Sequence, residues 1–173
     1  TILKGTILES LDEMMDWYQV EFNTTDEEGN TTTHKVSYAL KNGQSVGDVI
    51  TYTYEGKDYQ ATIIKEADVK HSKCKISDSS ESKAVYGVFQ AWDNDDDTVN
   101  DMYVAQVGTF IVRVNSSVTT LNKGDLIQSN GDGTGKVQSD DIIRASTVAK
   151  VLSTTKIETY ADGSYTVPCS LHC

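Results

Sequence analysis

The sequence predicts an all-β protein in which antiparallel hairpins form a small sandwich or barrel, with one short N-terminal helix. The composition is the first observation that predicts it: Thr, Val, Ile and Tyr supply 20, 17, 11 and 9 of the 173 residues. Branched and aromatic side chains favour the pleated surface of a strand. The second observation is that apolar and polar residues alternate over several short segments, and the third is that Gly-, Asn- and Asp-rich turn signals separate those segments.

The first half of the chain predicts one helix followed by a series of hairpins. Residues 10–17 (SLDEMMDW) are the helix candidate, because Ser10 and Glu13 have the spacing of a capping box. Strand-like alternation then recurs in four short segments: residues 18–22, 34–40, 50–54 and 59–63. We therefore expect residues 1–70 to form an N-terminal β-hairpin subdomain.

The second half predicts a denser β domain over residues 84–173. A charged, serine-rich stretch at residues 71–83 precedes it and predicts a polar linker or loop. Residues 46–50 (VGDVI) and 123–127 (KGDLI) echo one another across the two halves. In both segments Gly-Asp precedes an apolar pair, which predicts a tight turn entering a strand.

The charge balance argues against two classes of partner. The chain has 15 Lys and Arg against 26 Asp and Glu, which gives a formal net charge of −11. Nucleic acid and anionic membranes repel such a chain at long range, so we expect neither as a partner. No apolar run approaches the roughly 20 residues that a bilayer-spanning helix needs.

An acidic cluster suggests a calcium site. Carboxylate oxygens are the ligands that Ca²⁺ prefers, and the EF-hand pattern requires Gly at its sixth position and Glu at its twelfth. Here those positions hold Thr98 and Val104, so the interpretations that remain are a calcium site of another kind and a solvated turn. The candidate ligands are Asp93, Asp95, Asp97 and Asp101, with Asn100 between them.

Sulfur and imidazole groups suggest a zinc site. Four such groups in one place would form a tetrahedral site. The alternatives are buried thiols with an exposed tail, or a disulfide between Cys74 and Cys169. The candidate ligands are His71, Cys74, Cys169, His172 and Cys173.

No catalytic residue follows from the sequence. None of the three histidines stands in a Ser-His-Asp or Cys-His context, and residues 131–135 (GDGTG) lack the Lys-Ser/Thr of a phosphate loop. We interpret residues 131–135 as a hairpin turn. Apart from calcium or zinc, we expect no cofactor.

Several stretches of the second half carry a family resemblance: residues 85–89 (VYGVF), 108–114 (GTFIVRV), 121–127 (LNKGDLI), 136–141 (KVQSDD), 146–151 (STVAKV) and 162–169 (DGSYTVPC). Through them, residues 84–170 resemble a domain near the C-termini of bacteriophage and algal-virus structural proteins, including tail-fibre-like and appendage proteins. Some of these proteins are grouped with autoproteolytic intramolecular-chaperone domains.

The resemblance implies a structural protein of a virus particle, located in the virion, in a tail, fibre or surface appendage. Its partners would be other copies of itself, with a trimer favoured, and other virion proteins. Large apolar residues without a clear place in one small core are the candidate interface anchors, although Phe110 also suits an ordinary core. They are Trp17, Trp92, Tyr103 and Phe110.

Two alternative functions accompany this one. The resemblance also implies a self-cleaving intramolecular chaperone, but no cleavage site of that family matches this sequence residue by residue. Thr1 would suit a cut in which its hydroxyl attacks the preceding carbonyl, and a trimmed chain would explain Thr1 equally well. The third interpretation is a binding module of an appendage, in which the loop at residues 93–101 or nearby aromatic side chains recognise a cation or a glycan.

Overall fold

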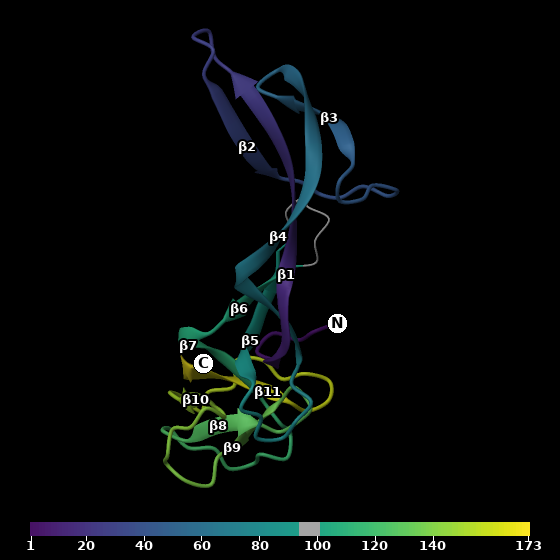
Figure 1. Ribbon diagram of the computed structural model, residues 1–173. Helices are drawn as coiled ribbons and strands as arrows, with labels where there is room; N and C mark the ends of the chain where they lie inside the picture. The colour runs from purple at the N-terminus through teal and green to yellow at the C-terminus, as the bar shows by residue number, and fades with distance from the viewer. Residues whose placement is uncertain (94–100) are drawn as a thin grey trace. The chain divides into compact units, whose positions relative to one another are not determined.

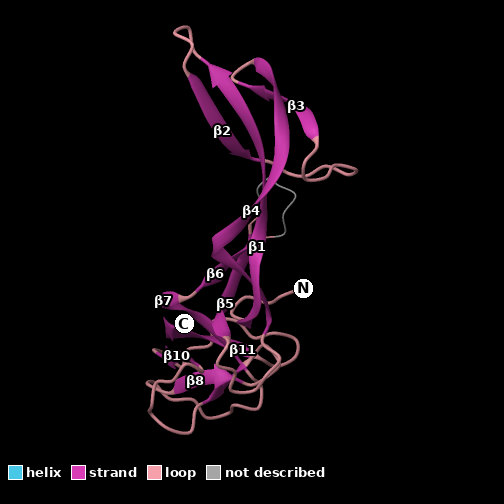
Figure 2. Ribbon diagram, viewed as in Figure 1, coloured by secondary structure: helices cyan, strands magenta, loops and turns pink. Residues whose placement is uncertain are grey.

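The computed structural model describes residues 1–93 and 101–173, with the side chains of all of these except Asp16 and residues 67–69. The described chain is all-β and contains no helix (Figures 1 and 2), so the predicted fold class is confirmed. Accordingly, no helix that could cross a membrane occurs in these residues.

The predicted N-terminal helix is wrong, because residues 10–17 lie inside strand β1 (Ile7–Thr25). The Ser10 hydroxyl accepts a hydrogen bond from the Asp12 backbone N–H at 3.2 Å, a local contact beside the positive φ of 59° at Asp12. An eight-residue helix has little stability of its own. Hydrogen bonding along β1 therefore overrides the local capping signal.

The described residues form two compact units. The barrel unit comprises Thr1–Glu13, 73–93 and 101–173, and the hairpin unit comprises Met14–Ser72. Strand β4 (Lys57–Ile76) continues into the segment at 71–83 for which the sequence predicts a linker or loop.

The hairpin unit is a strongly curled antiparallel sheet. Its strand order is β2 (Thr31–Ser37), β1, β4 and β3 (Val49–Tyr54). His34 on β2 and Tyr54 on β3 lie at opposite ends of this order, yet their ring centroids are 5.1 Å apart. The sheet therefore closes over its own apolar face, where both rings pack against Phe22 of β1.

The barrel unit contains the remaining strands. They are β5 (Val85–Trp92), β6 (Met102–Ala105), β7 (Val107–Val114), β8 (Leu126–Ser129), β9 (Gly135–Val137), β10 (Thr147–Val151) and β11 (Tyr165–His172). Five of them close a barrel in the order β10-β11-β7-β9-β8. All neighbours in the barrel are antiparallel except β7 and β9.

The barrel core is made of fully buried aliphatic side chains. Val112 of β7, Ile127 of β8 and Val167 of β11 have no exposed surface, and Ile7 of β1 joins them. Burying aliphatic surface of this kind stabilises the fold by about 25 cal/mol per Å².

The two Gly-Asp segments form the same turn, which confirms that interpretation. Gly47 and Gly124 have φ angles of 95° and 97°. Their backbone N–H groups donate to Ile63 O and Val151 O respectively, both at 2.8 Å. The next strand begins within two residues of each glycine, at Val49 and at Leu126.

Candidate functional site

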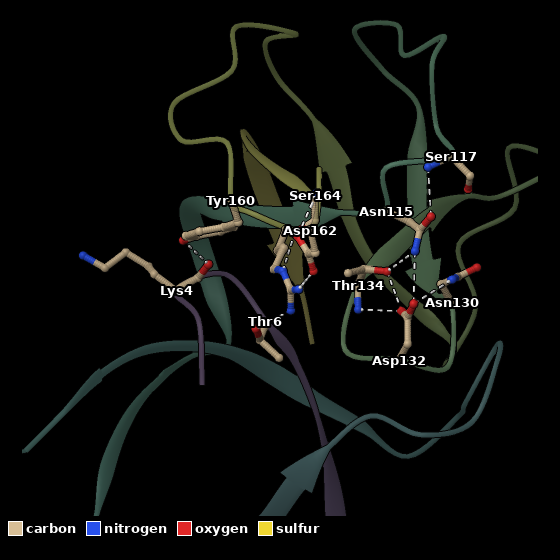
Figure 3. Close-up of polar contacts among 11 residues, drawn as sticks. Lys4, Thr6, Asn115, Ser117, Asn130, Asp132, Thr134, Tyr160, Asp162 and Ser164 are labelled. Atoms are coloured by element: carbon tan, nitrogen blue, oxygen red, sulfur yellow. Dashed lines mark hydrogen bonds and ion pairs between the residues drawn. The ribbon is translucent and has the colours of Figure 1, made fainter. Parts of the chain in front are cut away.

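One polar network of the barrel unit is built on the outward face near the end of β7. Arg113 and Asn115 are two residues apart, so their side chains project on the same side of an extended backbone. Each side chain binds a turn with the pattern Asp-Gly-Ser/Thr, at residues 162–164 and 132–134 respectively. Figure 3 shows both turns, and we call this arrangement the β7 clasp.

In the turn at 132–134, the first along the chain, Asp132 accepts hydrogen bonds from the Thr134 backbone N–H at 3.1 Å and from the Thr134 hydroxyl. The Asn115 amide then donates to Asp132 Oδ2 and to Thr134 Oγ1, both at 3.0 Å. Asn130 donates to the same carboxylate at 3.3 Å. The turn is therefore held by the neutral amides of the residues that follow β7 and β8.

In the second turn, at 162–164, Asp162 accepts hydrogen bonds from the Ser164 backbone N–H at 2.9 Å and from the Ser164 hydroxyl. Arg113 donates from Nε to Ser164 Oγ at 2.7 Å, and its Nη2 pairs with Asp162. Arg113 also reaches Thr6 Oγ1 at 3.3 Å and lies 5.7 Å from the ring centroid of Tyr160. This turn is held by a guanidinium whose side chain is only 11% exposed.

The pKa directions follow from these contacts. Hydrogen bonds from the Ser164 hydroxyl and backbone, supported by Arg113, lower the pKa of Asp162 to about 2. Burial acts to raise the pKa of Asp132, but hydrogen bonds from Thr134 and the nearby positive charge of Arg113 lower it overall. Both carboxylates are consequently ionised at neutral pH.

The β7 clasp is suited to holding loops and not to nucleophilic catalysis. The hydroxyls of Ser164 and Thr134 each donate to a carboxylate, and they accept from Arg113 and Asn115 respectively. Neither hydroxyl has a histidine as its base in the described part of the chain. The clasp was not predicted from the sequence, although the repeated Asp-Gly-Ser/Thr pattern was a signal that could have indicated it.

A surface pocket of about 310 Å³ lies next to the second turn. Its lining combines hydroxyl, ammonium, aliphatic and aromatic groups. The Tyr165 hydroxyl donates to Val118 O at 2.6 Å, and Lys156 Nζ lies 4.3 Å from the Tyr165 ring centroid. The lining residues are Ser116, Val118, Thr119, Leu121, Thr154, Lys156, Gly163 and Tyr165.

A second buried polar group fixes the N-terminal part of β1. The Glu9 carboxylate, on a residue only 4% exposed, accepts from the Ser77 hydroxyl at 2.7 Å and the Asp78 backbone N–H at 3.0 Å. Ser77 Oγ lies in turn against Ser129 Oγ of β8. Burial acts to raise the pKa of Glu9, but these hydrogen bonds outweigh it and lower the pKa. The group therefore stays charged and links β1, the end of β4 and β8.

The four predicted interface anchors have different surroundings. Trp17 is half-buried in the hairpin unit, with its ring edge-on to His71 at 5.7 Å. Trp92 and Tyr103, on β5 and β6, are 39% and 53% exposed. Phe110 is half-buried and packs against the barrel core, which is the core alternative foreseen for it.

The calcium candidates are only partly described. The Asp93 backbone N–H donates to the Asp101 carbonyl at 3.0 Å, which closes the ends of this loop. Asp95, Asp97 and Asn100 lie outside the described residues. The calcium site therefore stays a prediction.

The zinc candidates are spread over different surroundings. Cys169 is fully buried on β11 and Cys173 packs against the barrel core, whereas His172 of the same strand is exposed. Cys74 Sγ lies 3.9 Å from Met102 Sδ, and all three cysteines are free thiols. Within residues 1–93 and 101–173, no three His, Cys, Asp or Glu side chains are grouped so that they could hold a metal. Zinc also stays a prediction.

Comparison with family models, with curated proteins and with solved structures finds no match to this chain.

Proposed function

We propose that this chain is a structural protein of a virus particle, part of a tail, fibre or surface appendage, and that it acts by self-assembly. The proposal draws on the sequence resemblance over residues 84–170 and on an all-β architecture with a closed, clasped barrel. Its partners are other copies, with a trimer favoured, and other virion proteins. A charge of −11 keeps the unassembled chain soluble and disfavours nucleic acid and anionic membranes.

The observation that carries the proposal is the exposed apolar edge formed by β6 and the start of β7. Tyr103 and Val107 are 53% and 80% exposed. β6 pairs with β5 and stands last in its sheet order, whereas Val107 of β7 pairs with His172 of β11. Large apolar side chains exposed at the last strand of a sheet form a surface on which another chain can pack.

Native mass spectrometry tests the proposal directly. We expect masses that are multiples of 19.0 kDa, with the trimer dominant. Replacing Tyr103 and Val107 together by Lys should return the protein to monomer, because like charges would face each other across the edge. Val49→Lys is the matched control, since Val49 is 63% exposed but lies in the hairpin unit.

Two results would contradict the proposal. One is a wild-type chain that stays monomeric over the whole accessible concentration range. The other is an oligomer that Val49→Lys disrupts as strongly as the double substitution at β6 and β7 does.

A further inference from the structure

The pocket beside the second turn of the β7 clasp presents polar groups that the protein itself leaves unused. The hydroxyls of Ser116, Thr119 and Thr154 make no hydrogen bond within the described part of the chain. The ammonium of Lys156 rests on the Tyr165 ring and pairs with no described carboxylate. Residues with three hydroxyls and one cation thus line one cavity, in a chain whose net charge is −11.

The pocket wall is also held in place. Gly163 has a φ of 85°, and a Cβ added there would lie 3.1 Å from Ser116 Cβ, so only glycine leaves this wall unchanged. Asp162 and Ser164 on either side of Gly163 are both bound by Arg113. The pocket wall is therefore preorganised, and preorganised sites lose less conformational entropy on binding.

The lining defines a class of ligand. Hydroxyl groups both donate and accept hydrogen bonds, as the hydroxyls of a sugar do, and one ammonium matches one carboxylate. A volume of about 310 Å³ stands at the small end of ligand pockets, which suits a single sugar ring. Phosphate usually binds several backbone N–H groups or more than one cation, and the residues lining this pocket include only one cationic side chain.

We propose that this pocket binds a sugar unit that carries a carboxylate. Lys156 pairs with the carboxylate, and Ser116, Thr119 and Thr154 bind the sugar hydroxyls. The inference concerns a site separate from the apolar edge of β6 and β7, and it holds whether or not the chain assembles through that edge.

The test is an NMR titration of the ¹⁵N-labelled full chain with methyl glucuronoside. Methyl glucoside, which has the same ring without the carboxylate, and inorganic phosphate are titrated in parallel. We expect saturable shifts for the amides around the pocket with the glucuronoside, and at least about tenfold weaker binding of the glucoside, as expected when one charge-assisted hydrogen bond is lost.

Variants locate the binding. Lys156→Gln should weaken glucuronoside binding at least about tenfold, and Thr154→Val should weaken it by a smaller factor. Lys41→Gln is the matched control, because it removes the same charge from an exposed lysine of the hairpin unit. The spectrum of each free variant shows whether the barrel is folded.

The proposal would be overturned by any of four results. The first is an absence of saturable shifts at the pocket, and the second is an affinity for the glucoside equal to that for the glucuronoside. The third is phosphate binding as strong as glucuronoside binding. The fourth is an equal loss of glucuronoside affinity in the folded Lys156→Gln and Lys41→Gln variants.

Discussion

Replacing Gly5 by Ala should destabilise the barrel unit strongly, because Gly5 lies where two strands leave no room for a side chain. Its N–H donates to Phe89 O of β5 at 2.9 Å, and its carbonyl accepts from the Arg113 N–H of β7 at 2.9 Å. A Cβ at Gly5 would lie 2.9 Å from Arg113 N, closer than real Cβ atoms approach, and 3.3 Å from Ile111 O. Gly5 also has a φ of 86°, which costs an L-residue about 1–2 kcal/mol.

The matched control is Gly124→Ala in the same unit. Gly124 has a φ of 97°, but no atom lies within 4 Å of a Cβ added there. The control therefore carries the conformational cost alone, about 1–2 kcal/mol. Gly5→Ala adds the cost of forcing atoms into a packed region, about 1–3 kcal/mol, so its total loss is about 2–5 kcal/mol.

Urea unfolding, followed by NMR signals of barrel-unit residues, measures both variants. Following individual residues matters, because the two units need not unfold in one transition. We expect the midpoint of Gly5→Ala to lie well below that of Gly124→Ala. If the two variants lose the same stability, the close approach of Gly5 to Arg113 does not contribute, and the account of how residue 5 joins β5 to β7 is wrong.

Three further outcomes follow from the local environments of single residues. The pKa of Asp162 is lowered from 3.8 to about 2, so its stabilising contribution is complete above about pH 4 and is lost as the pH falls toward 2. Asp162→Asn should therefore reduce the pH dependence of the urea midpoint in that range. A variant whose urea midpoint depends on pH as the wild type's does would count against the clasp. Asn42 precedes an open Gly43, whose backbone nitrogen can attack the Asn side chain and release ammonia, whereas Asn130 is bonded to Asp132. Peptide mapping after prolonged incubation should find conversion to aspartate and isoaspartate at Asn42 first, and earlier conversion at Asn130 would contradict this. Burial raises the pKa of the Cys169 thiol to about 12, so iodoacetamide should modify Cys169 only in urea, as peptide mapping would show. Modification of Cys169 itself in the folded chain would refute its burial.

Short-range signals predicted the turns and most strands of the hairpin unit. The alternation at 50–54 corresponds to β3, which spans Val49–Tyr54, and both Gly-Asp turns occur where they were expected. The helix prediction was wrong because pairing with distant strands outweighed a short-range signal. Residues 10–17 carry a capping pattern, but β1 continues through them as one 19-residue strand. No local sequence pattern indicates how β1 pairs with its neighbouring strands.

The sequence predicted a sandwich or a barrel, but it could not predict which strands close the barrel, because closure depends on pairs distant in the chain. β7 pairs with β11 through a register in which Val112 faces Val167, over fifty residues away. The candidate site could not be predicted from the sequence for the same reason. Arg113 and Asn115 look like the polar face of an ordinary strand, and only the fold brings residues 132–134 and 162–164 to them.

The two turns of the β7 clasp also explain why the pocket lies where it does. Both turns use the same internal bonds, so each is locally stable, but only the turn at 162–164 is bound by a charged side chain. Arg113, whose side chain is only 11% exposed, pairs with Asp162, and the exposed Gly163 beside Asp162 lines the pocket. The Arg113 guanidinium is paired with Asp162 and does not line the cavity, so Lys156 is the cationic side chain among the lining residues.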